Sequence, residues 1–284
     1  MVDMDNVTFP SNGLKIAGHL YRPQGAPRGA IVVGHPGTGV KEQTAGLYAQ
    51  QLAEQGFLAL AFDAAYQGES AGEPRGLEDP FQRVEDIRAA AKFLSEEDER
   101  VGVLGICASG GYGVAAAGTD HRIKAIATVS LADIARQFRF GADGTQDPAV
   151  LRGMLDQVRD GSFTLFPETG EQASAGGPHS YEGWEYYCTP RGEHPRSAKT
   201  VTWSSVGRIA AFDAFRAVDL IAPRPLLLVA GREAVTSWMS VEAYQKAGGP
   251  KEFHWVDGAT HVDLYDRYVP QVVERVTEFF AKNL

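Results

Sequence analysis

The chain has 284 residues, of which 44% are hydrophobic and 22% are charged, and its formal net charge at pH 7 is −9. Nucleic acid is not expected as a partner, because phosphates are bound by basic surfaces. No apolar run approaches the roughly 18 residues that span a bilayer, so the composition predicts a globular protein without a membrane partner.

The N-terminal residues, MVDMDNVTFP, carry acids and lack the basic segment followed by an apolar segment that marks a signal peptide. We therefore expect no secretion signal and a cytoplasmic location. Thiols stay reduced in that compartment, so Cys107 and Cys188 are not expected to form a disulfide. Each thiol then needs an explanation in burial or in chemistry.

Short apolar runs alternate with amphipathic helical segments, as in a parallel sheet whose strands are joined by helices. An N-terminal hairpin is predicted, with VTFP followed by residues 14–23. Nearly continuous apolar runs, typical of strands buried on both faces, begin at Ala30, Phe57, Val101, Ile123 and Pro225. The final segment, 268–284, places apolar residues on one helical face and is predicted to dock on the sheet. The predicted fold class is α/β, with a mostly parallel central sheet and flanking helices.

Residues 134–223 interrupt this alternation with few strand signals and many turn residues, such as Asp160-Gly161. We interpret 1–284 as a single domain in which this segment is an inserted cap. Large aromatic side chains are frequent in it and either form the core of the cap or line an apolar substrate pocket. They include Phe138, Phe140, Phe163, Phe166, Tyr181, Trp184, Tyr186, Tyr187 and Trp203.

The most specific local pattern is an apolar strand that runs directly into Gly105-Ile106-Cys107-Ala108-Ser109. A nucleophile elbow has this arrangement, because small residues two positions before and after the nucleophile let strand and helix pass closely. Counting from the strand places Cys107 at the apex, as the nucleophile. Ser109, which precedes two glycines, is the alternative nucleophile in a shifted register. A buried cysteine without a chemical role is the third interpretation.

A thiol nucleophile needs a general base, and the N-terminus of a helix lowers its pKa. A helix that begins at Ala108 is expected to have this effect on Cys107. His261 follows a short apolar strand and precedes the last helix, and the order along the chain, nucleophile first and histidine late, is that of a hydrolase triad. We predict His261 as the base.

The loop after the strand that begins at Ala30 contains His35-Pro36-Gly37-Thr38-Gly39. A glycine-rich loop at this place can offer backbone N–H groups to an oxyanion, and the residue after the nucleophile offers another. We therefore expect the oxyanion donors at Gly37, Thr38 and Ala108. A Pro-Gly pair is also a common turn signal, so this expectation depends on the elbow.

Together these motifs resemble the dienelactone-hydrolase-like branch of the α/β-hydrolase superfamily. The chain is more closely similar to bacterial and fungal relatives that include polyketide-processing transferases. The resemblance covers nearly the whole chain, through His35-Pro36-Gly37, the loop 63–70, the elbow and the run 258–266. It implies an α/β-hydrolase fold and acyl chemistry on esters, lactones or thioesters, with no cofactor and no metal.

The chain departs from this family at the triad acid. Relatives usually carry Asp in a Gly-x-Glu-Ala-Asp-Thr run, where this sequence has Gly-Arg-Glu-Ala-Val235-Thr. Asp133 is the favoured substitute, because it stands where related thioesterase domains place their acid, although it could equally be a helix N-cap before Ile134. Glu233 is the second candidate. Without either carboxylate, Cys107 and His261 would act as a dyad.

The expected function is acyl transfer to water or to an acceptor through an S-acyl-cysteine intermediate. The expected partner is a small-molecule acyl substrate, with a carrier-bound form and a homo-oligomer both compatible with the sequence. Two alternatives remain open. One is a cyclase that forms a carbon-carbon bond from a thioester, and the other is a hydrolase-fold protein that only binds its ligand, which the missing Asp at Val235 would permit.

Overall fold

The computed structural model describes residues 2–157 and 160–284. The remaining positions include 158 and 159, which belong to the predicted cap and lie outside the described residues. Eight strands form one sheet in the order β1-β2-β4-β3-β5-β6-β9-β10. The pairs β1-β2 and β2-β4 are antiparallel and the others are parallel. This confirms the predicted α/β class with a mostly parallel central sheet.

The strands follow the predicted runs closely. Their bounds are β1 Asp3–Ser11, β2 Leu14–Arg22, β3 Ala30–Gly34, β4 Leu58–Phe62, β5 Val101–Ile106, β6 Ile123–Val129, β9 Leu226–Gly231 and β10 Lys251–Val256. Asn12 and Gly13, both with positive φ, make the two-residue turn between β1 and β2, as a tight hairpin requires. Strands β3, β4, β5 and β9 are buried along their whole length, because helices cover both faces of a parallel sheet.

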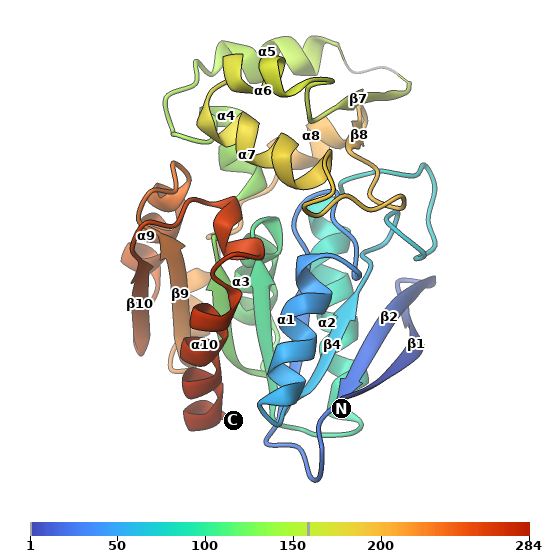
Figure 1. The fold of residues 1–284 in the computed structure, drawn as a ribbon, viewed down its shortest axis with the longest axis vertical. Coiled ribbons are helices and arrows are strands. Elements are labelled where there is room, and N and C mark those ends of the chain that lie inside the picture. Colours follow the sequence, from blue (N-terminus) through green and yellow to red (C-terminus); the bar gives the residue numbers. More distant parts are fainter. Residues whose placement is uncertain (1, 158–159) are drawn as a thin grey trace.

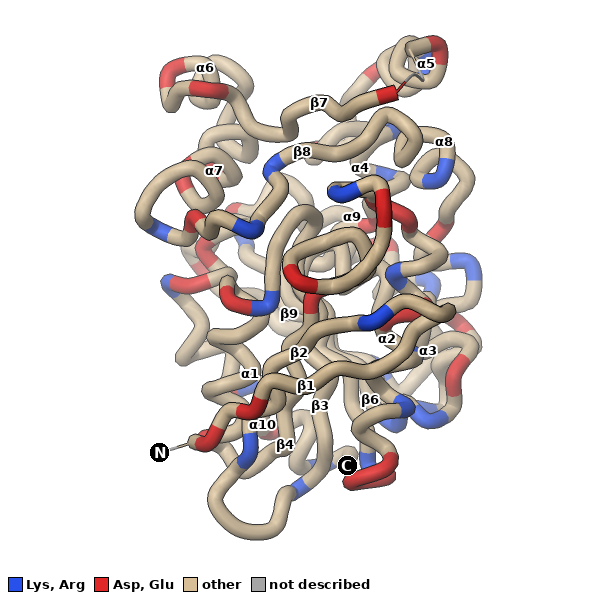
Figure 2. The backbone as a smooth tube through the Cα atoms, turned by 90° about the vertical axis from the view of Figure 1, so that its right-hand side faces the viewer, with Lys and Arg blue, Asp and Glu red and all other residues tan. Residues whose placement is uncertain are grey.

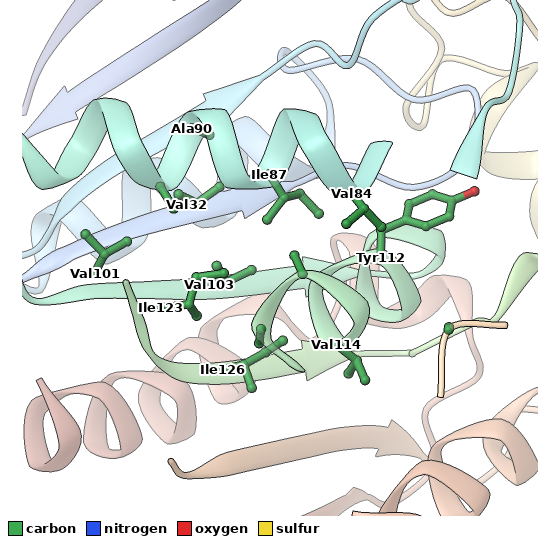
Figure 3. Close-up of a cluster of buried hydrophobic side chains, with 14 of the residues drawn as sticks. Val32, Val84, Ile87, Ala90, Val101, Val103, Tyr112, Val114, Ile123 and Ile126 are labelled. Atoms are coloured by element: carbon green, nitrogen blue, oxygen red, sulfur yellow. The ribbon is translucent and has the colours of Figure 1, made fainter. Parts of the chain in front are cut away.

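Two layers of helices cover the sheet (Figure 1). Helices α1 (Thr44–Glu54) and α10 (Val269–Asn283) pack on one face, and α2 (Pro80–Ser95), α3 (Ala108–Thr119) and α9 (Ser237–Lys246) on the other. Figure 3 shows the core on the face covered by α2 and α3, where Val84 and Ile87 of α2 and Tyr112 of α3 meet Val103 of β5. The apolar face of α10 is buried as the sequence predicts.

Residues 134–223 connect β6 to β9 and lie above the carboxyl ends of the parallel strands (Figure 1). We call this segment the β6–β9 insertion. Its elements are α4 Ile134–Phe140, α5 Ala149–Asp156, β7 Ser162–Thr164, α6 Gly170–Ala175, α7 Pro178–Tyr187, β8 Thr200–Thr202, α8 Ser205–Ala210 and the 3₁₀ turn η1 Val218–Ile221. A second 3₁₀ turn, η2 Val262–Tyr265, precedes α10 at the same end of the sheet.

Charged residues of both signs are interspersed along the chain, and the central strands are nearly free of them (Figure 2). Among the described helices, none combines the length and the apolar character needed to cross a membrane.

The turn from β5 to α3 is the tightest crossing in the sheet. Cys107 has φ 53° and ψ −119°, a backbone conformation that residues other than glycine rarely adopt. A Cβ atom at Gly105 would overlap the carbonyl oxygen of Ser109, and a Cβ at Gly34 would lie 2.7 Å from the Ser109 Cβ. Strand and helix can therefore cross here only because Gly105 and Gly34 have no side chain.

We expect Gly105→Ala to lower the free energy of unfolding by about 1–3 kcal/mol, because backbone atoms must move to admit the methyl group. Gly153→Ala is the matched control, because its Cβ in helix α5 would meet nothing within 4 Å. This substitution should raise the free energy of unfolding by up to about 1 kcal/mol, since alanine has the higher helix propensity. Urea unfolding followed by circular dichroism measures both. Equal midpoints for Gly105→Ala and the wild type would contradict this account of the turn.

Candidate active site

Cys107 occupies the apex of the β5-α3 turn, where its backbone N–H donates to the Val129 carbonyl at 2.9 Å. Its own carbonyl accepts from the Gly110 and Ala132 amides at 2.8 and 3.0 Å. Ser109 lies two residues further along, inside α3, and its buried hydroxyl donates to the His35 carbonyl at 2.5 Å. Of the two registers considered from the sequence, the structure therefore places Cys107, and not Ser109, at the apex.

The Cys107 thiol lines a cavity of about 340 Å³ between the sheet and the β6–β9 insertion. One wall contains Gly37, Ala108, His261 and Tyr265, which come from the loops at the carboxyl ends of the strands. The opposite wall comes from the insertion and is largely apolar, with polar side-chain groups on Gln137, His179, Ser180 and Tyr187. It includes Ile134, Gln137, Phe138, Leu165, Phe166, His179, Ser180 and Tyr187.

Two of the three predicted oxyanion donors face the thiol. The backbone N–H groups of Gly37 and Ala108 hydrogen-bond the Cys107 sulfur, and both residues line the cavity. Thr38 is fully buried behind them, with φ 57°, and its carbonyl accepts from the Ser197 hydroxyl at 2.8 Å. Thr38 is not among the described residues that line the cavity, so the geometry supports Gly37 and Ala108 as the donor pair.

A buried arginine holds the oxyanion loop, which the sequence did not reveal. Arg83 of α2 donates to His35 Nε2 at 2.9 Å and to the His35 carbonyl at 3.0 Å, and it pairs with Glu78 at 3.2 Å. The Ala64 amide also donates to Nε2, so the proton of His35 lies on Nδ1, which donates to the Pro36 carbonyl at 2.6 Å. Burial and the charge of Arg83 hold the pKa of His35 well below its ordinary value.

His261 lies between β10 and η2 and is almost completely buried. Its Nδ1 contacts the Thr236 hydroxyl at 2.5 Å, and its Nε2 contacts the Tyr265 hydroxyl at 3.0 Å. Burial, with a smaller contribution from nearby His179, holds the pKa of His261 well below its ordinary value. The imidazole is therefore neutral and has two uncharged partners.

The structure does not bring either predicted acid to His261. Asp133 is the N-cap of α4, where its carboxylate accepts from the Ala135 amide at 2.9 Å and pairs with Arg136. It also accepts from the Ala214 amide at 3.2 Å, so a structural role accounts for this carboxylate. Glu233 is exposed to solvent. The expectation that one of these carboxylates orients the imidazole is therefore wrong in geometry.

Thr236 and Tyr265 are the functional residues that sequence reasoning missed. Thr236 is the residue directly after Val235, which occupies the family's usual acid position, so the adjacent hydroxyl was the available signal. Tyr265 lies four residues after His261 in the short turn η2, a spacing that brings the two side chains together. Its hydroxyl bonds both His261 Nε2 and the Cys107 thiol.

Comparisons with known proteins identify the family. Residues 16–130 match the dienelactone hydrolase family. The chain is 41% identical over 271 residues to the uncharacterized protein YcjY of Escherichia coli, with 90% of this chain and 89% of that protein covered. The chain belongs to the dienelactone hydrolase family.

Two further relatives extend the comparison over the full length. The uncharacterized protein PA2218 of Pseudomonas aeruginosa is 36% identical over 302 residues, covering 100% of this chain and 81% of that protein. Its crystal structure has a TM-score of 0.92, with 100% of this chain and 94% of that chain covered. The polyketide transferase af380 of Aspergillus fumigatus is 26% identical over 296 residues, covering 100% of this chain and 99% of that protein. The resemblance seen in the sequence is thereby confirmed.

The charge state of the thiol in this family member differs from the expectation. Burial raises the pKa of Cys107, and the hydrogen bonds from Tyr265, Ala108 and Gly37 only partly oppose this effect. The predicted lowering of the pKa by the helix N-terminus is therefore wrong, because removing the thiol from water outweighs the N–H groups. Cys107 and His261 are both neutral in the free protein.

A cluster of three carboxylates lies in the loops that follow strands β3 and β4. Glu42, Asp63 and Glu69 are close enough together to hold a cation. The ammonium of Lys41 lies among them, at 2.7, 2.8 and 2.6 Å from the three groups. Arg196 of the β6–β9 insertion pairs with Glu42 at 2.5 Å. Side-chain cations therefore neutralise this cluster, which ties the insertion to the sheet.

We expect alkylation of Cys107 by iodoacetamide to keep accelerating as the pH rises, without a plateau below pH 8, because only the thiolate reacts and the pKa of Cys107 is raised. Tyr265→Phe removes a hydrogen bond that favours the thiolate, so it should slow the reaction at pH 8. Tyr181→Phe, at an exposed position, is the matched control. Peptide mapping by mass spectrometry follows Cys107 and Cys188 separately. A plateau below pH 8 would mean that the thiol is activated in the free protein.

Proposed function

We propose that the chain is an acyl hydrolase or acyltransferase that acts on an ester, lactone or thioester through an S-acyl-Cys107 intermediate. The observation that carries this proposal is the position of the Cys107 sulfur, at the apex of a strained turn and opposite the N–H groups of Gly37 and Ala108. A carbonyl carbon attacked by this sulfur would place its oxygen between the two donors, where developing negative charge is stabilised.

The acylation step follows from the neutral resting state. In the tautomer that a base requires, Nδ1 of His261 donates to Thr236, and Nε2 accepts from the Tyr265 hydroxyl. As the sulfur attacks, the thiol proton passes to the Tyr265 oxygen while the Tyr265 proton passes to Nε2. The leaving alcohol or thiol then takes a proton back from the imidazolium. Tyr265 is thus a relay between nucleophile and base.

The cavity favours an uncharged acyl group of modest size. The insertion wall is mostly aliphatic and aromatic, and no Lys, Arg, Asp or Glu is among the described lining residues. A carboxylate or ammonium on the acyl chain would lose its hydration there without gaining a partner. A volume of about 340 Å³ is at the lower end of ligand-binding pockets. We infer that the β6–β9 insertion acts as a cap of a single domain and selects the acyl chain.

Transfer as well as hydrolysis is included because a full-length relative, af380, is named as a polyketide transferase. A cavity that keeps bulk water away from the thioester also suits transfer, because competing hydrolysis of the thioester is slowed.

We expect rapid-quench incubation with acyl thioesters and p-nitrophenyl esters to add one acyl mass to the intact protein, located on Cys107. Cys107→Ala should abolish the adduct and lower turnover by about 10³-fold or more. Ser109→Ala and Cys188→Ala are the controls and should still acylate Cys107. Adduct formation in Cys107→Ala but not in Ser109→Ala would move the nucleophile to Ser109.

The same experiment separates the two alternative functions. A cyclase would release a product with the mass of the acyl chain and no acceptor added, because carbon of the same chain attacks the thioester. A protein that only binds would protect Cys107 from alkylation without forming an adduct with any donor.

The pH dependence of turnover tests the role of Thr236. Because the pKa of His261 is lowered, and the base acts in its neutral form, kcat/KM should stay high below pH 6.5 before it falls. Thr236→Asp places a carboxylate beside Nδ1, which should raise the pKa of His261 by about 1–3 units and move this fall to higher pH.

Thr236→Val is the uncharged control and should lower kcat without moving the fall upward, since it only removes the Nδ1 partner. The measurement is kcat/KM for a p-nitrophenyl ester between pH 4.5 and 9. A wild-type fall centred at or above pH 6.5 would contradict the neutral-site description.

A further inference from the structure

His179 is a second histidine at the centre of the cavity, and the acylation step does not use it. It belongs to α7 of the insertion, and its ring meets the His261 ring edge-to-face, with centroids 5.0 Å apart and an interplanar angle of 85°. Its Nε2 lies 3.5 Å from the Gln137 amide nitrogen. Its Nδ1 is buried and has no hydrogen-bond partner among the described residues.

His179 as a whole is half-buried, and the cost falls on its buried Nδ1. An unsatisfied buried polar atom costs about 1–3 kcal/mol, so it points to a ligand that is absent from the free protein. Burial lowers the pKa of His179 to about 4. The imidazole is therefore neutral near pH 7, with one nitrogen that donates and one that accepts.

A second cavity, of about 230 Å³, lies on the other side of His179. It shares His179, Ala142 and Gly176 with the cavity that contains Cys107, and we call it the side cavity. Val235, at the family's usual acid position, lines the side cavity together with Asp143. The two cavities thus adjoin at His179, which lines both of them.

We propose that the side cavity binds the acyl acceptor, an uncharged alcohol, and that His179 holds the hydroxyl of this alcohol beside His261. This inference rests on the proposed acyl-enzyme function. With an acyl chain in the larger cavity, a second molecule needs its own approach to the thioester, and the side cavity adjoins the larger one at His179. A hydroxyl both donates and accepts, which matches His179 on one side and the base on the other.

Charge selects against anionic acceptors. The exposed carboxylate of Asp143 lies on the side cavity, and hydrogen bonds from Thr145 lower its pKa, so it stays ionised near pH 7. No Lys or Arg is among the described residues that line either cavity. A hydroxy acid would therefore meet repulsion at the same place where a neutral alcohol is admitted.

In the transfer step the alcohol displaces the Cys107 sulfur from the acyl group. The alcohol oxygen, held by His179, attacks the carbonyl carbon of the thioester while its proton passes to His261. The carbon–sulfur bond then breaks, and the departing sulfur takes the proton from the imidazolium through Tyr265. The products are the new ester and the Cys107 thiol.

The test measures how acyl-Cys107 partitions between water and an added alcohol. The protein is acylated with a p-nitrophenyl ester in the presence of n-butanol, and the ratio of butyl ester to free acid is determined by chromatography. Each ratio is taken within one variant, so a change in overall rate cancels. Methanol and glycolate serve as a smaller and an anionic acceptor.

His179→Phe should lower the ester-to-acid ratio by about tenfold, as expected for the loss of one hydrogen bond, and His179→Gln should lower it less. Val235→Trp fills the side cavity and should lower the ratio for butanol more than for methanol. Two matched changes outside both cavities, His121→Phe and exposed Val150→Trp, should keep the wild-type ratio. Asp143→Asn should raise the use of glycolate.

Acylation of Cys107 with wild-type ratios in both His179→Phe and Val235→Trp would overturn the acceptor site and leave the proposed function intact. If the wild type never acylates Cys107, the proposed function and this inference fall together. If His179→Phe does not fold, Val235→Trp and His179→Gln still decide the outcome.

Discussion

The close crossing of strand β5 and helix α3 determines where the Cys107 thiol and the Ala108 N–H lie. Gly105 and Gly34 bring the backbone of β5 and β3 against Ser109, and the chain can turn between them only with Cys107 at positive φ. With this conformation Cys107 lines the cavity, and the Ala108 N–H at the start of α3 lies beside its sulfur. Backbone strain of this kind persists only where surrounding packing enforces it, and α3 is buried along most of its length against the sheet.

Burial then sets the chemistry by keeping the site uncharged. A preformed thiolate–imidazolium pair would have to be stabilised against the loss of hydration that burial causes. Among the described residues no carboxylate contacts His261 to help. Thr236 and Tyr265 supply hydrogen bonds without charge, so the base stays neutral and the thiol stays protonated until a carbonyl arrives. This arrangement also explains the position of Asp133, because its pairing with Arg136 and its bonds at the start of α4 leave it fully engaged elsewhere.

Local patterns predicted much of this fold and part of the site. The elbow is a pattern of five adjacent residues, and the buried strands are continuous apolar runs. The apex position of Cys107 and the succession of strands along the chain could therefore be predicted from the sequence. The contacts of His261 could not, because Thr236 and Tyr265 reach it from separate loops and their geometry depends on how β9 and β10 end. The charge state of Cys107 was mispredicted for a similar reason: a helix N-terminus is visible in sequence, while the depth of burial that outweighs it is a property of the whole packed chain.

In the proposed function the β6–β9 insertion selects the acyl chain, and ion pairs attach this insertion to the rest of the protein. Arg196 joins the insertion to Glu42 in the cluster around buried Lys41, and Arg191 joins it to Asp266, next to the turn that carries Tyr265. Ion pairs that are partly buried and shared among several groups hold geometry better than isolated surface pairs. The insertion is therefore fixed at both the oxyanion side and the base side of the site. Helix α7 ends at Tyr187, shortly before Arg191, and its Glu182 accepts from the Val262 amide at 3.2 Å. The His179 imidazole on α7 therefore keeps a defined place relative to His261, and the proposed acceptor could be oriented without a large closing motion.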